Sequence, residues 1–269
     1  MRAVVTGGAG YIGSGLVYLL RLNGWDVEAV DSRGGVGVTE ARVQEFTPQL
    51  KPDVVFHLAA ESNIEIVERI PTVVDDDMAA AEAVLEWGAR RIVFTSSSAV
   101  YAEHSLPVTE ESPVGPMSRY AVGKLACEKI LDGAVILRLF NVIGDGNRSR
   151  DDERNSHLIP ALRSKSFTLN GNDWDTPDGT TIRSWVDVEA VHAALLRGVR
   201  LRPDVYNVGG TILSTLSVVQ LWERLHAPVK INPGPRRRGD VERILGDDSK
   251  LQALGWNRGR SIDQVISQL

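Results

Sequence analysis

The sequence predicts an α/β protein built on a doubly wound parallel sheet. Short apolar runs alternate with helical segments over the first two thirds of the chain, and a glycine-rich turn at residues 7–13 follows the first run. Alternation of this kind is typical of a parallel sheet with helices on both faces. The predicted strands are Ala3–Thr6, Asp26–Val30, Val54–Leu58, Arg91–Ser96, Ala134–Leu139 and Val205–Val208.

Composition limits the classes of protein to which the chain can belong. Of its 269 residues 43% are hydrophobic, and the net charge of −5 argues against a broad nucleic-acid-binding surface. The single cysteine, Cys127, excludes an internal disulfide and favours a reducing compartment. The first strand begins beside Met1, which leaves no room for a secretion signal, and no apolar run approaches the ~20 residues that span a bilayer. We therefore expect a cytoplasmic protein without a nucleic-acid, membrane or metal partner.

The glycine-rich turn joins the first strand to the first helix. Tyr11 to Asn23 carries apolar residues at helical spacing, so the turn leads directly into a helix start. Free N–H groups and the helix dipole favour a pyrophosphate there, and Gly7, Gly10 and Gly13 allow a ligand to approach the backbone. A tight strand-to-helix connection without a ligand is the alternative. The context favours a dinucleotide site of the Rossmann type.

The second predicted strand ends on Asp31, about 20 residues beyond the turn. An acidic side chain at this position can accept hydrogen bonds from both hydroxyls of an adenosine ribose, and it would repel a 2′-phosphate. Asp31 therefore favours NAD over NADP as the cofactor. Arg33 keeps NADP open, because its guanidinium could pair with that phosphate. A plain strand-ending turn is the other interpretation of Asp31.

Tyr120 and Lys124 lie four residues apart, so they are neighbours on one face of a predicted helix at Ser118–Leu131. A nearby ammonium group favours the phenolate form of a tyrosine. A phenolate near neutral pH is a general base for a sugar hydroxyl, and the alkoxide so formed can give up hydride to NAD. An ordinary amphipathic pair is the alternative interpretation.

Several segments together resemble the extended short-chain dehydrogenase/reductase family, which includes the NAD-dependent epimerases and dehydratases. The spacing Gly7-x-x-Gly10-x-x-Gly13 and the pair Tyr120-x-x-x-Lys124 fit its pattern, and the match covers nearly the whole chain. Further matching segments are residues 53–60, 91–101, 137–141 and 171–185. Within the family the chain is most similar to the nucleotide-sugar epimerases of the UDP-galactose 4-epimerase type.

The resemblance implies a role for each matching residue. Tyr120 becomes the base, Lys124 tunes it and holds the nicotinamide ribose, and Ser97, four residues before Tyr101, bonds the same sugar hydroxyl. The implied NAD-binding residues are Gly7, Gly10, Tyr11, Ile12, Gly13, Asp31, Ser32, Leu58, Ala59, Ala60, Thr95, Tyr120 and Lys124. The implied residues for a nucleotide-sugar substrate, a UDP-hexose, are Ser97, Asn141, His157, Leu158, Arg183, Arg237 and Asp240.

The residues after Ser97 distinguish among reactions of the family. Relatives that remove water carry an acidic pair there, whereas this chain has Ser98 and Ala99, neither of which is an acid or base. The expected reaction is epimerisation at C4 by transient oxidation and non-stereospecific re-reduction. Two alternatives remain: a dehydratase or 4-ketoreductase of the same family, and a sensor that binds NAD(P) without turnover.

The resemblance also predicts domain organisation and assembly. Residues 1–140 and 186–209 form the expected NAD-binding domain, and 141–185 and 210–269 form a smaller, discontinuous C-terminal substrate-binding domain. Helices at Asp76–Trp87 and Ser118–Leu131 correspond to the pair through which relatives form homodimers. A helix is also expected at Glu40–Leu50.

Some positions depart from the family pattern. The third strand is expected to be short or absent, which would leave the adenine edge open. Asp77 stands where the family has asparagine. Asp75, Asp76 and Asp77 together are interpreted as favourable charges at a helix start.

Overall fold

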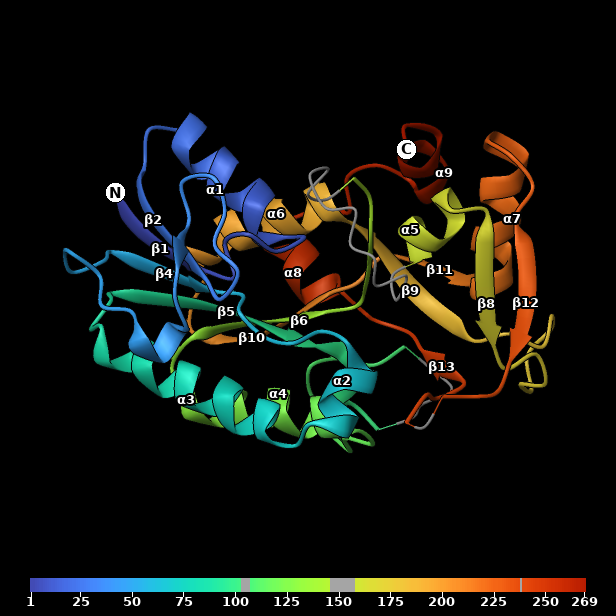
Figure 1. The fold of residues 1–269 in the computed structure, drawn as a ribbon, viewed down its shortest axis with the longest axis horizontal. Helices are drawn as coiled ribbons and strands as arrows, with labels where there is room; N and C mark the ends of the chain where they lie inside the picture. The colour runs from blue at the N-terminus through green and yellow to red at the C-terminus, as the bar shows by residue number, and fades with distance from the viewer. Residues whose placement is uncertain (103–106, 146–157, 238) are drawn as a thin grey trace.

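A seven-stranded sheet forms the N-terminal part of the molecule (Figure 1). The computed structural model describes residues 1–102, 107–145, 158–237 and 239–269. The sheet has the order β10-β6-β5-β4-β1-β2-β3, and neighbouring strands run parallel, which confirms the predicted fold class. Its strands are β1 (Arg2–Thr6), β2 (Asp26–Asp31), β3 (Thr39–Glu40), β4 (Val54–His57), β5 (Arg91–Ser97), β6 (Val135–Leu139) and β10 (Asp204–Val208).

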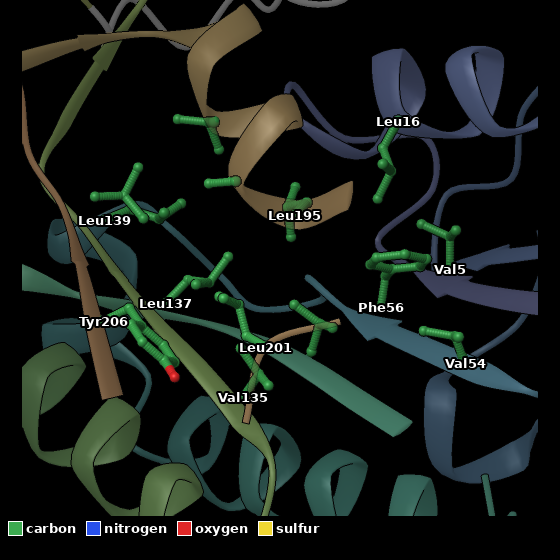
Figure 2. Close-up of a cluster of buried hydrophobic side chains, with 14 of the residues drawn as sticks. Val5, Leu16, Val54, Phe56, Val135, Leu137, Leu139, Leu195, Leu201 and Tyr206 are labelled. Atoms are coloured by element: carbon green, nitrogen blue, oxygen red, sulfur yellow. The ribbon is translucent and has the colours of Figure 1, made fainter. Parts of the chain in front are cut away.

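Helices cover both faces of this sheet. In Figure 1, α1 (Gly13–Leu22) and α6 (Val188–Gly198) lie on one side, and α3 (Thr72–Glu86) and α4 (Arg119–Ile130) lie on the other, next to the short α2 (Ile64–Arg69). Figure 2 shows the core under α1 and α6, where Phe56, Leu137 and Leu195 are fully buried. Such burial contributes about 1.5–3 kcal/mol for each large apolar side chain.

The order of the strands fixes where a ligand can bind. The chain leaves β1 toward β2 and β3 on one side and returns to β4, β5 and β6 on the other. A crevice opens beyond the carboxyl ends of the strands where this reversal occurs, because the adjoining loops turn away to opposite faces. The loops after β1 and β4 therefore form the centre of the expected site.

The second part is built from smaller sheets. In one, β9 (Ile182–Asp187) pairs with β7 (Asn141–Ile143), β11 (Thr211–Ser214) and β13 (Arg243–Ile244); the other joins β8 (Ser166–Asn170) to β12 (Lys230–Gly234). Their helices are α5 (Leu158–Arg163), α7 (Thr215–Leu225) and α9 (Ile262–Ser267). Trp185, Trp222 and Ile266 belong to the separate hydrophobic core of this part.

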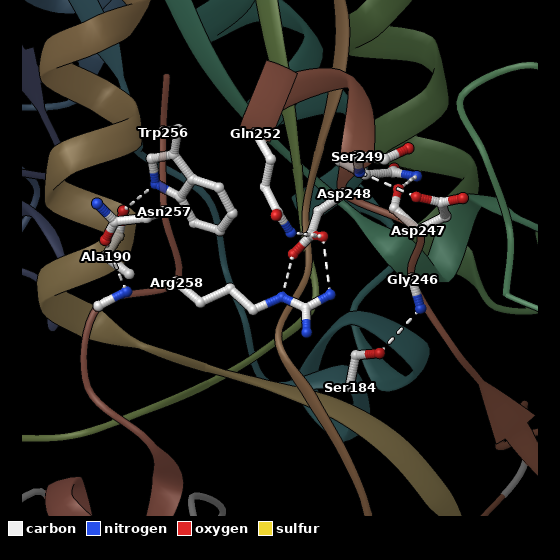
Figure 3. A network of polar contacts seen from close by, with 12 residues as sticks. Ser184, Ala190, Gly246, Asp247, Asp248, Ser249, Gln252, Trp256, Asn257 and Arg258 are labelled. Carbon is white, nitrogen blue, oxygen red and sulfur yellow. Dashed lines mark hydrogen bonds and ion pairs between the residues drawn. The ribbon is translucent and has the colours of Figure 1, made fainter. Parts of the chain in front are cut away.

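The chain returns to the large sheet near its C-terminus (Figure 3). There α8 (Ser249–Ala253) packs against β10, and the indole N–H of Trp256 donates to the carbonyl of Ala190 in α6 at 2.8 Å. The Asp248 carboxylate, 1% exposed, accepts two hydrogen bonds from Arg258 at 2.8 Å. The last quarter of the chain thus packs on both parts of the molecule, and the predicted domain boundaries stay a prediction.

The helix expected at Glu40–Leu50 is wrong. This stretch holds the two-residue β3 and a single 3-10 turn, η1 (Val43–Glu45). Pro48 disfavours helical geometry in the residue before it, and the apolar side chains are drawn inward, since Phe46 packs edge-on against Trp87 with ring centroids 5.7 Å apart. The third strand is short, as expected.

The start of α3 also differs from its prediction. The helix begins at Thr72, with Pro71 in helical geometry as its N-cap, so Asp75 is the acidic residue of the first turn. Asp76 and Asp77 lie beyond that turn and need another explanation. Among the helices in the described ranges, none has the length and apolar character needed to cross a membrane.

Candidate active site

A cavity of about 1040 Å³ extends along the carboxyl edge of the large sheet and into the second part. Side chains of the glycine-rich turn, of the loop after β4 and of α4 line it on one side. Residues of β8, β9 and the segment after β12 line it on the other. One cavity therefore brings together residues that are far apart in the sequence.

The glycine-rich turn forms the narrowest part of this wall. Gly7 has φ +70°, and a Cβ placed there would lie 2.9 Å from the backbone nitrogen of Ala59. A Cβ on Gly13, where α1 begins, would collide with the carbonyl oxygen of Gly7. Side chains are thus excluded on steric grounds, and backbone N–H groups at the start of α1 remain available to an anionic ligand.

Asp31 ends β2 next to this turn and is 3% exposed. One carboxylate oxygen accepts the backbone N–H of Ala9 at 3.2 Å. The other accepts the backbone N–H and the guanidinium Nε of Arg33, each at 3.1 Å. Asp31 is held in place by these bonds, and the Arg33 side chain is 44% exposed and so can move away when a ribose binds.

Thr6 and His57 hold the loop after β4 in position. The Thr6 hydroxyl oxygen accepts the backbone N–H groups of Leu58 and Ala59, both at 3.1 Å, and lies 2.8 Å from Nδ1 of His57. The two backbone N–H groups occupy both lone pairs of this oxygen, so the hydroxyl donates its own hydrogen bond to His57. Nδ1 of His57 is therefore the acceptor and carries no proton. Burial, with a smaller contribution from the Lys124 charge, lowers the pKa of His57 to about 3.

Lys124 lies behind the reacting region, 6% exposed. Its ammonium donates to the carbonyl of Thr95 at 2.9 Å and lies 4.9 Å from the centroid of the Phe94 ring. Both contacts orient the ammonium toward the cavity that Lys124, Thr95 and Tyr120 share.

Ser97 and Tyr120 enter the cavity from two adjoining elements. Ser97 ends β5 and caps η2 (Ser98–Val100), with its hydroxyl accepting the backbone N–H of Ala99 at 3.2 Å. Tyr120 lies in the first turn of α4, which is capped by Ser118. Helix α4 places Lys124 one turn after Tyr120, on the same side.

Arg183, Arg237 and Asp240 form the wall in the second part. The Arg183 guanidinium, on β9, donates to the carbonyls of Ile182, Val241 and Glu242 at 2.7–3.1 Å. Burial raises the pKa of Asp240, and the charges of Arg183 and Arg237 act against this rise. These three residues form a polar cluster of net positive charge.

Two further residues of the predicted substrate set also lie in the wall, namely Asn141 at the start of β7 and Leu158 at the start of α5. His157 lies outside the described residues. Every other site residue predicted from the sequence, including Tyr11, Ile12, Ser32 and Ala60, lies in the wall of this cavity. Tyr11 also donates a hydrogen bond to the carbonyl of Gly144 at 2.9 Å, and burial raises its pKa.

Sequence reasoning missed several lining residues. Strand β8 contributes Phe167, Thr168 and Asn170, and the two-residue alternation of Ser166–Asn170 is the signal that could have revealed it. With its side-chain oxygen turned toward Arg237, Asn170 accepts hydrogen bonds from that guanidinium at 3.2 Å. Glu61 and Asp77 also line the cavity, and no local pattern marks either of them.

The residues present fit a nicotinamide dinucleotide. The turn at Gly7 and Gly13 packs too closely on neighbouring backbone to carry a Cβ and borders the cavity, Asp31 ends β2 beside this turn, and Lys124 offers a cation elsewhere in the same cavity. Gly7, Gly13, Asp31 and Lys124 would hold such a cofactor through backbone N–H groups and charge-assisted hydrogen bonds.

Comparison with known proteins gives a consistent result. The model of the NAD dependent epimerase/dehydratase family matches residues 3–209. A UDP-glucose 4-epimerase of Lactobacillus helveticus is 31% identical over 315 aligned residues, which cover 99% of this chain and 95% of that protein. Because 315 exceeds the 269 residues of this chain, the relative carries insertions that this chain lacks.

Solved structures agree with the sequence comparison. The crystal structure of UDP-glucose 4-epimerase from Bifidobacterium longum in complex with NAD+ and UDP has a TM-score of 0.88 at 26% identity. The match covers 99% of this chain and 96% of that one. MoeE5 in complex with UDP-glucuronic acid and NAD has a TM-score of 0.84 at 29% identity, and the match covers 99% and 97% of the two chains.

Proposed function

Since the chain belongs to the NAD dependent epimerase/dehydratase family, we propose that it is a nucleotide-sugar 4-epimerase that acts on UDP-hexoses. The observation that carries this proposal is the shared cavity. Ser97, Tyr120 and Lys124 line it together with Arg183, Arg237 and Asp240, so groups suited to proton transfer and to a diphosphate face the same space. The relatives named UDP-glucose 4-epimerase support the choice of reaction.

Each residue has a distinct task in this reaction. Tyr120 takes the proton of the C4 hydroxyl in one direction and returns it in the other, as a general base and acid. Ser97 donates a hydrogen bond to the same oxygen. The Lys124 ammonium stabilises the phenolate of Tyr120 by its charge. Gly7, Gly13, Asp31 and Lys124 would hold NAD, which would supply reversible hydride transfer at C4.

The second part of the molecule binds the nucleotide. Arg183 and Arg237 supply guanidinium groups for the diphosphate, which such planar donors bind well. Asp240, close to both arginines, accepts hydrogen bonds from the ribose of the nucleotide. Since all three residues contact only the UDP moiety, the hexose is free to present either face to Tyr120.

Ser98 and Ala99 argue against loss of water, because neither side chain can act as an acid or a base at the reacting centre. Ser98 is 6% exposed and does not line the cavity. A change of configuration at C4, without elimination, is the outcome that this pair of residues allows.

The decisive test incubates the protein with UDP-glucose, UDP-galactose or their N-acetyl forms and measures by NMR which sugars are formed. We expect interconversion of C4 epimers with no net change in nicotinamide absorbance. Tyr120→Phe keeps the packing of the ring but removes the ionisable oxygen, so turnover should fall ~10²–10⁴-fold while folding and NAD binding survive.

A matched control is Tyr18→Phe, because Tyr18 is 66% exposed on α1, away from the cavity, and the same change there should leave turnover unaltered. Ser97→Ala should cost less than Tyr120→Phe, because it removes one hydrogen bond. Full epimerase activity in Tyr120→Phe would refute the mechanism. Irreversible formation of a dehydrated sugar by the wild type would assign the dehydratase reaction instead.

A further inference from the structure

Three consecutive aspartates in α3 have three different environments. Asp75 is exposed on the outer side of the helix. Asp76 borders the cavity and accepts a hydrogen bond from Arg42, which also borders it, at 3.0 Å in a half-exposed ion pair. Asp77 lines the cavity together with Lys124 and Tyr120. A helix turns about 100° at each residue, which explains how identical neighbours reach different surroundings.

The charged and titratable groups that act on Asp77 are one cation, two anions and a thiol. The Lys124 ammonium on α4 is the cation, and the backbone N–H of Glu61 donates to the Asp77 carboxylate. The acidic side chains of Glu61 and Asp76 are the like charges. Cys127 on α4 donates from Sγ to the backbone carbonyl of Asp77 at 3.6 Å, and burial raises the pKa of this thiol to about 11, so it stays neutral.

We propose that Asp77 is a positioning residue for the reacting centre, which acts on Tyr120 through the charge of Lys124. The proposal rests on Tyr120 being the base of the proposed function. Lys124 has a carbonyl partner in Thr95 and a ring partner in Phe94, and it lines the same cavity as Asp77. The attraction of its ammonium counteracts the rise that burial causes in the pKa of the Asp77 carboxyl, and Cys127, one turn after Lys124 on α4, contacts the Asp77 carbonyl. A buried ammonium needs an anionic partner, since desolvation of an unpaired charge is costly.

The charge of Asp77 opposes the effect of Lys124 on Tyr120. An ammonium favours the nearby phenolate, whereas a carboxylate beside the same ammonium partly cancels that field. Burial raises the pKa of Asp77 to about 6, and Lys124 and the Glu61 N–H counteract part of this rise. Above this pH Asp77 is charged and weakens the field on Tyr120; below it the full charge of Lys124 acts. The charge state of Asp77 thus changes the field that Lys124 exerts at Tyr120.

The test is Asp77→Asn, which removes the charge while its amide oxygen still accepts the Glu61 N–H. The readout is the ultraviolet difference absorbance of tyrosinate as pH is varied, in the protein loaded with NAD and without substrate. The part of the signal that Tyr120→Phe abolishes belongs to Tyr120. We expect Asp77→Asn to shift the midpoint of the Tyr120 signal to lower pH by about half a pH unit to one pH unit, because the carboxylate no longer offsets the Lys124 charge.

Asp75→Asn is the matched control, because it removes the same charge from the exposed side of the same helix. The Tyr120 signal should keep its wild-type position in this variant. If Asp77→Asn leaves the signal in place, or if Asp75→Asn moves it equally, the proposal is wrong. Asp77→Ser gives the same test if the asparagine variant does not fold. Because no turnover is measured, failure of this inference is distinguishable from failure of the proposed epimerase activity.

Discussion

At the scale of single residues, Asp31 is the side chain that we propose to govern the choice of cofactor. Its two oxygens are held by Ala9 and Arg33, so the carboxylate is already oriented before any ligand binds. A hydrogen bond from a ribose hydroxyl to this charged acceptor contributes about 1 kcal/mol or more. A 2′-phosphate in the same position would instead meet a buried negative charge.

We therefore expect the wild type to bind NAD more tightly than NADP, as measured by calorimetry. Asp31→Ala should weaken NAD and reduce the preference, because it removes both the acceptor and the repulsion. Arg33→Ala is the control: it should keep the preference for NAD, since the guanidinium is the only nearby group proposed to favour a phosphate. Equal affinity of the wild type for NAD and NADP would contradict this role of Asp31.

Single residues also show where sequence reasoning ends. The spacing of Tyr120 and Lys124 on one helix is visible in the sequence, and so is the position of Asp31 after a strand. Asp75, Asp76 and Asp77 look alike there, and only the packing of α3 against α4 and η1 leaves Asp75 exposed, pairs Asp76 with Arg42 and places Asp77 in the cavity beside Lys124. Burial of this kind depends on contacts between distant segments, which local patterns do not contain.

At the scale of elements, the junction of β1 and β4 supports the floor of the cavity. Thr6 ends β1, and its hydroxyl oxygen accepts hydrogen bonds from backbone N–H groups at the start of the loop after β4. His57 ends β4, accepts a hydrogen bond from the Thr6 hydroxyl and stacks on Phe94 with ring centroids 5.4 Å apart. This network works only while His57 is neutral, because a protonated Nδ1 cannot accept a hydrogen bond. The position of the loop is therefore linked to pH.

The sign of this linkage follows from the lowered pKa. His57 titrates at about 3 in the folded protein and near 6.5 when unfolded, so between these values the unfolded chain binds more protons. Stability should fall as pH decreases from about 6.5 toward 3, by a few kcal/mol in total. Urea unfolding of wild type and His57→Asn across this range checks the prediction.

Asparagine at position 57 keeps an acceptor for Thr6 but does not titrate. It also loses the stacking on Phe94, so His57→Asn should be less stable than the wild type at neutral pH. Its stability should nevertheless depend less on pH between 4 and 6.5, roughly the range in which the histidine would bind a proton. Equal slopes for the two proteins would rule out His57 as the source of the effect.

The sequence predicts some helices and strands well and misses others. Buried strands such as β1 and β4 are short apolar runs bounded by turns, and α4 (Arg119–Ile130) agrees with the helix predicted at Ser118–Leu131 to within one residue at each end. The predicted helix at residues 40–50 was wrong because an apolar spacing there serves a 3-10 turn packed on Trp87. The strands of the second part are short and half-buried; in β8 the alternation of polar and apolar residues extends over only five positions, which is a weak signal against the surrounding loops.

At the scale of the whole molecule, one cavity joins the carboxyl edge of the large sheet, proposed to bind the dinucleotide, to the wall of the second part, proposed to bind the nucleotide of the substrate. The parallel sheet was predictable from alternating strands and helices. The way in which β9, β13 and the segment after β12 bring Arg183, Arg237 and Asp240 together was implied only by family resemblance. Their pairing joins residues about 60 positions apart in the sequence, for example Arg183 and Val241 at 2.7 Å.

Exposed apolar residues on α3 and α4 suggest how two copies of the chain assemble. Helices α3 and α4 pack side by side on the outer face of the sheet (Figure 1), and Leu85, Met117 and Val122 on or beside them are 42%, 69% and 50% exposed. Exposed apolar side chains on adjoining helices favour association, because a second chain removes them from water. We expect a symmetric homodimer in which these helices meet their copies.

Light scattering at micromolar concentration should give twice the chain mass of 29.4 kDa. Val122→Glu should shift the mass toward one chain, since two symmetry-related charges would face each other across the interface while α4 keeps its buried side. Leu254→Glu is the control, because Leu254 is similarly exposed, at 43%, but lies after α8 on another surface. A wild-type mass of one chain would contradict the dimer, and a Val122→Glu variant that keeps the dimer mass would show that the interface lies elsewhere.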